Sequence, residues 1–109
     1  KISSAYELCM DLIEKKYNPE SWNIYIFQFS DGDNYNSDNE KCAEMLDKKI
    51  LPVTNLFGYG QVDLPRYGSE HEGDYVKHLR RNFDNHDKVA ISQVHNREEI
   101  WKCIKSFLG

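Results

Sequence analysis

The chain has 109 residues and carries 14 lysines and arginines against 18 aspartates and glutamates, for a formal net charge of −4. The length suffices for one domain with one hydrophobic core. The acidic residues are spread along the chain and the basic cluster at Arg80 and Arg81 is small, which argues against nucleic-acid binding. No apolar run reaches the roughly 18–20 residues of a membrane-spanning helix, so we expect no membrane association.

The chain begins at Lys1, inside a helical pattern, and we interpret residues 1–109 as a single domain that is part of a longer protein. Its three cysteines, Cys9, Cys42 and Cys103, are odd in number and far apart in sequence. This usage fits reduced, packed thiols better than disulfides or a zinc site. We therefore expect a cytoplasmic protein.

The first expected helix covers residues 4–17. Ser4 and Glu7 have the spacing of a capping box, in which the serine caps the helix and the glutamate reaches back to it. A helix cannot continue through Asn18-Pro19. Leu8 and Leu12 widen the apolar face of this helix. The residues at helical spacing are Tyr6, Cys9, Met10, Ile13 and Tyr17.

Residues 22–29 form a nearly continuous apolar and aromatic run. Such a run predicts a strand that is covered on both faces, as in parallel sheets. A polar loop over residues 30–37 follows. Ser37 then opens a second capping box and a helix over residues 37–49, and Pro52 marks the exit from this helix.

The second strand is expected over residues 53–59. An extension through 62–64 stays open, because Gly58 and Gly60 make the end of the strand ambiguous. A third helix is expected over residues 72–83, where apolar residues again recur at helical spacing.

Residues 89–94 are expected to form the third strand, and Asn96 to cap a last helix. The order of elements is then α-β-α-β-α-β-α, which predicts a parallel sheet with right-handed crossovers. We predict an α/β fold: a three-layer, Rossmann-like half-domain with about three parallel strands flanked by helices. The apolar face of the last helix is expected to consist of Ile100, Trp101, Ile104, Phe107 and Leu108.

An acidic loop follows the first strand: Ser30 is succeeded by Asp31, Gly32, Asp33 and Asn34. Open α/β sheets bind ligands outside the carboxyl ends of their strands. Carboxylate oxygens there suit Mg²⁺, Mn²⁺ or Ca²⁺. A single loop does not supply six oxygen ligands, so a site based on it would be incomplete.

Two other interpretations of this loop stay open. Asp, Gly and Asn are ordinary turn residues, so the loop can be a tight turn without a ligand. Alternatively, Asp31 and Asp33 could hold Mg²⁺ against phosphates in a phosphoryl-transfer enzyme. The chain has no phosphate loop of the GxxxxGK form to accompany them.

Short motifs along the chain form a recognisable pattern: Ser3-Ser4-Ala5, Trp22-Asn23-Ile24-Tyr25, Gln28, Ser30-Asp31-Gly32-Asp33-Asn34, Leu51-Pro52 and Phe83-Asp84-Asn85. The pattern resembles the YeaH/YhbH family of bacterial stress- and sporulation-associated proteins. The strand followed by Ser-Asp-Gly also resembles the third metal-contacting loop of von Willebrand factor A-type domains. The similarity covers essentially the whole chain, and its Ser-Asp-Gly-Asp-Asn block is its most specific part.

The resemblance implies the C-terminal half of an A-type domain whose metal site uses three loops. Only the third loop is present, with Asp31; the chain contains no Asp-x-Ser-x-Ser. The implied function is a non-enzymatic protein-interaction module, in which Mg²⁺ or Mn²⁺ held partly by Asp31 accepts a carboxylate from a partner protein. Ser30, Asp33 and Asn34 would shape the loop, and a PrkA-type serine kinase system is an implied partner.

Three expectations follow for these 109 residues. The ion should bind weakly, because most of its ligands would be water. The strand over residues 22–29 would be central in the intact domain, so here its bare edge invites self-association. Arg66 and Tyr67, in the loop after the second strand, could contact a protein partner, since arginine and tyrosine are enriched in binding hot spots; alternatively Tyr67 only packs the loop down.

Overall fold

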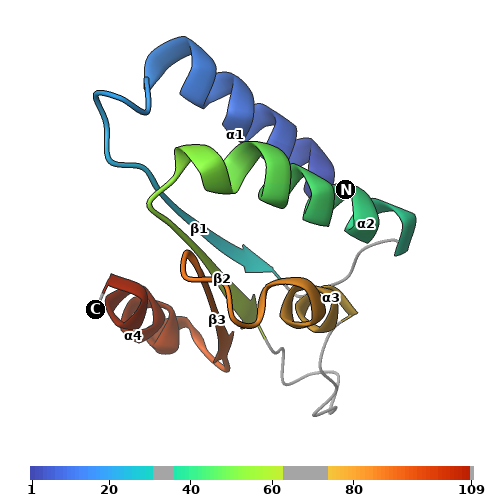
Figure 1. Ribbon diagram of the computed structural model, residues 1–109. Helices are drawn as coiled ribbons and strands as arrows, with labels where there is room; N and C mark the ends of the chain where they lie inside the picture. Colours follow the sequence, from blue (N-terminus) through green and yellow to red (C-terminus); the bar gives the residue numbers. More distant parts are fainter. Residues whose placement is uncertain (31–35, 63–73, 109) are drawn as a thin grey trace.

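The computed structural model describes residues 1–30, 36–62 and 74–108 (Figure 1). Four α-helices alternate with three strands in these ranges. A π-helical turn and a 3-10 turn extend the second helix. In chain order the elements are α1 (Ile2–Lys16), β1 (Tyr25–Ser30), α2 (Asn36–Met45), η1 (Leu46–Ile50), η2 (Leu51–Val53), β2 (Leu56–Val62), α3 (Asp74–Phe83), β3 (Val89–Val94) and α4 (Arg97–Leu108).

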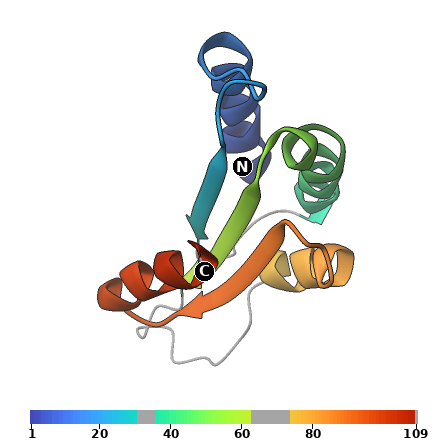
Figure 2. The ribbon, with the colours of Figure 1, turned by 60° about the vertical axis from the view of Figure 1, so that its left-hand side comes forward.

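The three strands form one parallel sheet in the order β1-β2-β3. Tyr25 lies opposite Leu56, and Phe57 opposite Val89. Helices α1, α2 and α3 cover one face of the sheet and α4 the other, as Figures 1 and 2 show from two directions. The predicted α/β architecture with helices on both faces is therefore confirmed.

The main core lies between the sheet and the layer formed by α1, α2 and α3. Residues alternate along a strand, so every second side chain of each strand faces this layer. On β2 these side chains are the fully buried rings of Phe57 and Tyr59. The helices contribute the other members of the buried cluster, namely Tyr6, Cys42, Met45, Leu46, Ile50, Leu51, Tyr75, Val76, Leu79 and Phe83.

Helix α4 packs on the opposite face, where β2 carries two glycines. A methyl group added at Gly58 would overlap the ring of Phe107, and one added at Gly60 would overlap the ring of Phe29. Phe107 also stacks on Phe27 of β1, with ring centroids 5.8 Å apart. Both glycines lie inside the strand. Each is needed at its position, because an aromatic ring occupies the space that a larger side chain would take. The second strand runs over Leu56–Val62 and starts later than expected.

The first helix differs from the expected one at its start. It begins at Ile2, so Ser4 is an exposed residue of the first turn rather than the cap. Glu7 forms an ion pair with Lys41 of α2, at 2.9 Å, instead of turning back to Ser4.

Leu8 and Leu12 do not belong to the buried face of α1, contrary to the expectation. The buried residues of this helix are Ser3, Tyr6 and Ile13. At 100° per residue the two leucines point away from that side, and both are exposed.

The first strand is shorter than the apolar run that predicted it. Trp22 is 54% exposed and packs edge-on against Tyr17, with ring centroids 5.3 Å apart. The strand begins only after Ile24, whose backbone N–H donates to the side-chain oxygen of Asn55 at 2.8 Å.

The second helix also departs from the expected ends. It starts at Asn36, one residue before the predicted cap. Pro52 does not mark its exit, because the chain continues through η1 and η2 to Val53. Proline is tolerated near the start of the 3-10 turn, where its missing N–H needs no partner.

The last helix is capped as predicted, since the side-chain oxygen of Asn96 accepts a hydrogen bond from the backbone N–H of Glu99 at 3.1 Å. Trp101 was expected on the apolar face but is 61% exposed, with the ammonium group of Lys105 over its ring. Within residues 1–30, 36–62 and 74–108, none of the helices combines the length and the apolar character that crossing a bilayer requires.

Candidate functional site at the carboxyl edge of the sheet

Strand ends and helix starts converge at the carboxyl edge of the sheet. β1 ends there at Ser30 and β2 at Val62, and α2 and α3 begin after them. Helix α1 runs antiparallel to β1, so its first turn reaches the same edge, beside the start of α2 (Figure 1). The positive ends of three helix dipoles therefore lie together where open α/β sheets bind ligands.

Of the residues predicted to form a site, Ser30 is the one that the structure describes. It is the last residue of β1, half-buried, and lies opposite Gln61 of β2. The roles proposed for all of these residues, Ser30 included, remain predictions. Those that lie outside the described residues are Asp31, Asp33, Asn34, Arg66 and Tyr67.

A buried carboxylate, Asp38, joins α1 to α2 at this edge. It lies in the first turn of α2 and is 5% exposed. Its carboxylate accepts hydrogen bonds from the backbone N–H of Ser3, at 3.1 Å, and from the Ser3 hydroxyl. The thiol of Cys42 donates a weaker bond to it at 3.6 Å. Asp38 thus caps α1 from another helix and places its charge at two positive helix ends.

A second set of polar contacts joins α1, β1 and α3. The Tyr6 hydroxyl donates to the side-chain oxygen of Gln28 at 2.6 Å, and it is also hydrogen-bonded to the hydroxyl of Tyr75. Because the proton of Tyr6 is directed to Gln28, Tyr75 is the donor in the second bond. Nearby, the Tyr59 hydroxyl donates to the buried side chain of Gln61 at 3.0 Å.

Burial keeps Tyr6, Tyr75 and Cys42 neutral. Desolvation raises the pKa of Tyr6 and of Tyr75 above that of an ordinary tyrosine. Desolvation, with the negative charge of Asp38 as a smaller cause, raises the pKa of the Cys42 thiol to about 12. At neutral pH, Cys42 is therefore a protonated donor and not a nucleophile.

These contacts tie the elements at this edge to one another. Asp38, Tyr6 and Tyr75 fix the first turns of α1, α2 and α3 against one another and against β1. Within the described ranges, no three His, Cys, Asp or Glu side chains stand together as a metal site.

This network was not predicted from the sequence. One signal was available: Gln28 interrupts an apolar strand at a position that faces the helices, as Ile26 does two residues earlier. A buried amide there requires a polar partner. No local pattern could identify that partner as Tyr6, which is 22 residues away in sequence.

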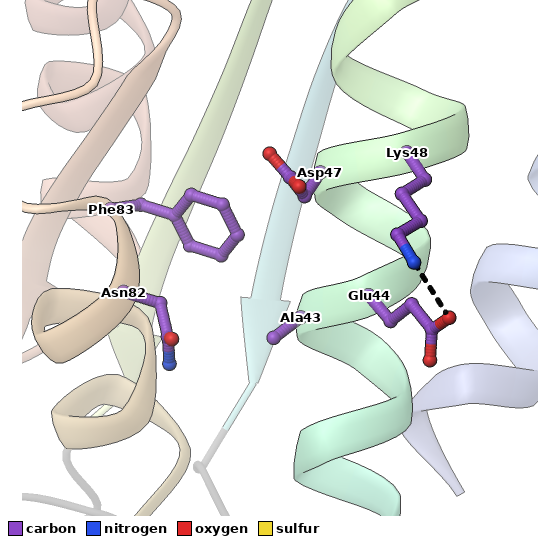
Figure 3. A pocket seen from close by; sticks show the side chains of 6 residues that line it. All are labelled: Ala43, Glu44, Asp47, Lys48, Asn82 and Phe83. Atoms are coloured by element: carbon purple, nitrogen blue, oxygen red, sulfur yellow. Dashed lines mark hydrogen bonds and ion pairs between the residues drawn. The ribbon is translucent and has the colours of Figure 1, made fainter.

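A separate groove of about 370 Å³ runs between α2–η1 and α3. Figure 3 shows the carboxylate of Asp47 facing the ring of Phe83 across it. Glu44 is paired with Lys48 at 3.2 Å on the outer side of α2. The groove is open and lies on the helical layer. Its lining residues are Ala43, Glu44, Asp47, Lys48, Asn82 and Phe83.

The fold and this edge define an α/β domain with a short parallel sheet. Over residues 1–109 the sequence matches the family described as "Protein of unknown function (DUF444)". A "UPF0229 protein" of Ruminiclostridium cellulolyticum is 36% identical over 111 residues, which cover 98% of this chain and 26% of that protein. No solved structure matches the chain.

The chain belongs to the DUF444 family. This is the family that includes the YeaH/YhbH proteins, so the family resemblance seen in the sequence is confirmed. The chain spans about a quarter of the length of the relative.

Proposed function

We propose that residues 1–109 are the C-terminal half of a von Willebrand A-type domain that acts as a non-enzymatic protein-interaction module. In this proposal a divalent ion, Mg²⁺ or Mn²⁺, is held partly by Asp31 and accepts a carboxylate from a partner protein. Ser30, Asp33 and Asn34 shape the loop around the ion. Arg66 and Tyr67 add contacts to the partner.

One observation carries the proposal: β1 ends at Ser30, the residue before Asp31 in sequence, at the carboxyl edge of a parallel sheet where three helices begin. Ligands of open α/β sheets bind at this edge. The network around Asp38 and Tyr6 supports the proposal, because a recognition surface works best on an edge that is already rigid.

The family supplies the biological setting of the proposal. Through its relation to YeaH/YhbH proteins we infer a role in bacterial stress response or sporulation, in the cytoplasm, together with a PrkA-type serine kinase system. The remaining ion ligands would come from other parts of the full-length protein, so the 109 residues alone should bind the ion weakly.

The substitution Asp31→Ala in the full-length protein tests this proposal. We expect affinity for Mn²⁺, measured by calorimetric titration, to fall about tenfold or more, because an anionic oxygen ligand is lost. Asp87→Ala is the matched control: Asp87 is exposed and lies between α3 and β3, at the opposite edge of the sheet. Equal affinity in Asp31→Ala and the unsubstituted protein would remove Asp31 from the ion site.

The variants Asp31→Ala and Asp33→Ala separate this function from phosphoryl transfer. A Mg²⁺-dependent hydrolysis of ATP that both Asp31→Ala and Asp33→Ala abolish would favour the enzyme. If the domain is an interaction module, Asp31→Ala should lose partner binding, and the unsubstituted protein should not hydrolyse ATP.

A further inference from the structure

The groove between α2–η1 and α3 carries a net negative charge. Its lining holds two carboxylates, of Glu44 and Asp47, and one ammonium group, of Lys48. Lys48 pairs with Glu44 on the outer side of α2. The Asp47 carboxylate turns the other way, into the groove, and among the described residues no hydrogen bond or ion pair engages it (Figure 3). The groove therefore presents an anionic acceptor that the described part of the chain does not compensate.

A second acceptor comes from α3. The side-chain amide of Asn82 donates an N–H to the backbone carbonyl of His78 at 2.8 Å. This bond orients the amide and leaves its oxygen available to the groove, which Asn82 lines. The oxygens of Asn82 and Asp47 both accept hydrogen bonds, so the groove favours a ligand that donates them.

An aromatic ring forms part of the opposite wall. Phe83 is 5% exposed and belongs to the buried core cluster, so the core holds its ring in position. The ring lies across the groove from the Asp47 carboxylate (Figure 3). A cation that enters between a carboxylate and an aromatic ring gains both an ion pair and a favourable contact with the ring.

The groove also coincides with the π-helical turn. Asp47 and Lys48 belong to η1, and the backbone is helical on both sides of this turn, at Met45 and Leu51. π-helical turns inside helices are rare and are frequently found at functional sites. The backbone conformation and the charge are independent observations on the same wall of the groove.

These features distinguish between classes of ligand. An anion would be repelled by the Asp47 carboxylate, and within residues 1–30, 36–62 and 74–108 no group of three His, Cys, Asp or Glu side chains could hold a metal ion. Pockets for small molecules normally enclose them, whereas this groove of about 370 Å³ is open. A cationic side chain that reaches in from another protein fits an open groove.

Arginine fits the groove better than lysine. A guanidinium group donates two parallel hydrogen bonds to one carboxylate and packs its flat face on aromatic rings. The lysine ammonium is a compact, strongly hydrated charge that has neither property. The pairing of a carboxylate with a ring in this groove therefore favours arginine.

We propose that this groove binds an arginine side chain of a partner protein. The guanidinium group pairs with Asp47 and donates to the oxygen of Asn82, and the carbon stem of the arginine lies along Phe83. The proposal does not depend on an ion at Asp31.

Methyl NMR of the full-length protein with isotope-labelled alanine tests the site, because Ala43 lines the groove. The probe is the peptide acetyl-Gly-Arg-Gly-amide, and Ala90 of β3 is the internal reference. We expect a saturable shift of the Ala43 signal with the Ala90 signal unchanged. Peptides with lysine or with citrulline, which has the shape of arginine without its charge, should bind about threefold more weakly or less. An unmoved Ala43 signal overturns the proposal, and so does equal binding of either replacement peptide.

The substitution Asp47→Asn tests the carboxylate. We expect the affinity for the arginine peptide to fall about five- to tenfold, because a charge-assisted pair becomes a neutral one. Asp11→Asn is the matched control: Asp11 is exposed and lies on α1, so the substitution removes the same charge outside the groove. Both variants should fold, because both aspartates are exposed. Equal losses in the two variants, or no loss in Asp47→Asn, overturn the role of Asp47.

Discussion

Asp38 is the residue on which the described site depends most. A buried carboxylate is costly unless hydrogen bonds and favourable charges compensate its lost hydration. Asp38 has both: Ser3 donates to it twice, and two helices direct their positive ends at it. The residue therefore stabilises the junction of α1 and α2 and holds the edge in place.

We expect Asp38→Ala to lower the free energy of unfolding by about 2–3 kcal/mol, because the N–H and hydroxyl of Ser3 lose their buried acceptor. Ser3→Ala is the matched control and should cost about 1 kcal/mol, since the backbone bond to Asp38 persists. Urea denaturation measures both. A smaller effect for Asp38→Ala than for Ser3→Ala would contradict this role.

The close approach of α4 to β2 is decided by two elements together. Gly58 provides space on the strand, and Phe107 of the helix fills it while stacking on Phe27. In the sequence the two glycines left the end of the strand ambiguous, since glycine weakens strands and favours turns. The rings that face them lie far away in sequence: Phe107 comes about fifty residues after Gly58, and Phe29 about thirty residues before Gly60.

We expect Gly58→Ala to destabilise the protein by about 1–3 kcal/mol, because the new methyl group must displace Phe107. In a Phe107→Ala background the same substitution should cost clearly less, since the ring is absent. A double-mutant cycle by chemical denaturation measures this coupling. An identical cost in both backgrounds would refute the proposed contact.

At the scale of the whole molecule, the stability of the protein should depend on pH, because Cys42, Tyr6 and Tyr75 are buried in their neutral forms. The pKa of Cys42 is raised from its ordinary value of 9.0 to about 12, and burial also raises the pKa values of Tyr6 and Tyr75. Above pH 9 the unfolded chain releases a proton that the native Cys42 keeps. The stabilisation is therefore complete below pH 9 and is lost as the pH rises toward 12.

We expect the free energy of unfolding to decrease by about 1.4 kcal/mol per pH unit for each such group, starting with Cys42 above pH 9 and steepening above pH 10 as the tyrosines titrate in the unfolded chain. Urea denaturation at several pH values measures the slope. Cys42→Ala should be less stable overall but have a shallower slope between pH 9 and 10. An unchanged slope there would show that Cys42 does not cause it.

The sequence by itself determined the order of elements, the parallel sheet and the family. Local signals sufficed for these. Helical spacing over residues 72–83 predicted the third helix, which the structure describes over Asp74–Phe83. The strand over Val89–Val94 and the Asn96 cap are confirmed. Each depends on residues a few positions apart, whose physics is contained in a short window.

Only the tertiary structure decided which faces are buried and which polar groups meet. Leu8 and Trp101 are exposed, and Asp38 accepts a hydrogen bond from Ser3, which is 35 residues away in sequence. Both findings have the same physical cause. Burial and hydrogen bonding between elements depend on which surfaces the packed helices leave open, and no local window of sequence contains that information.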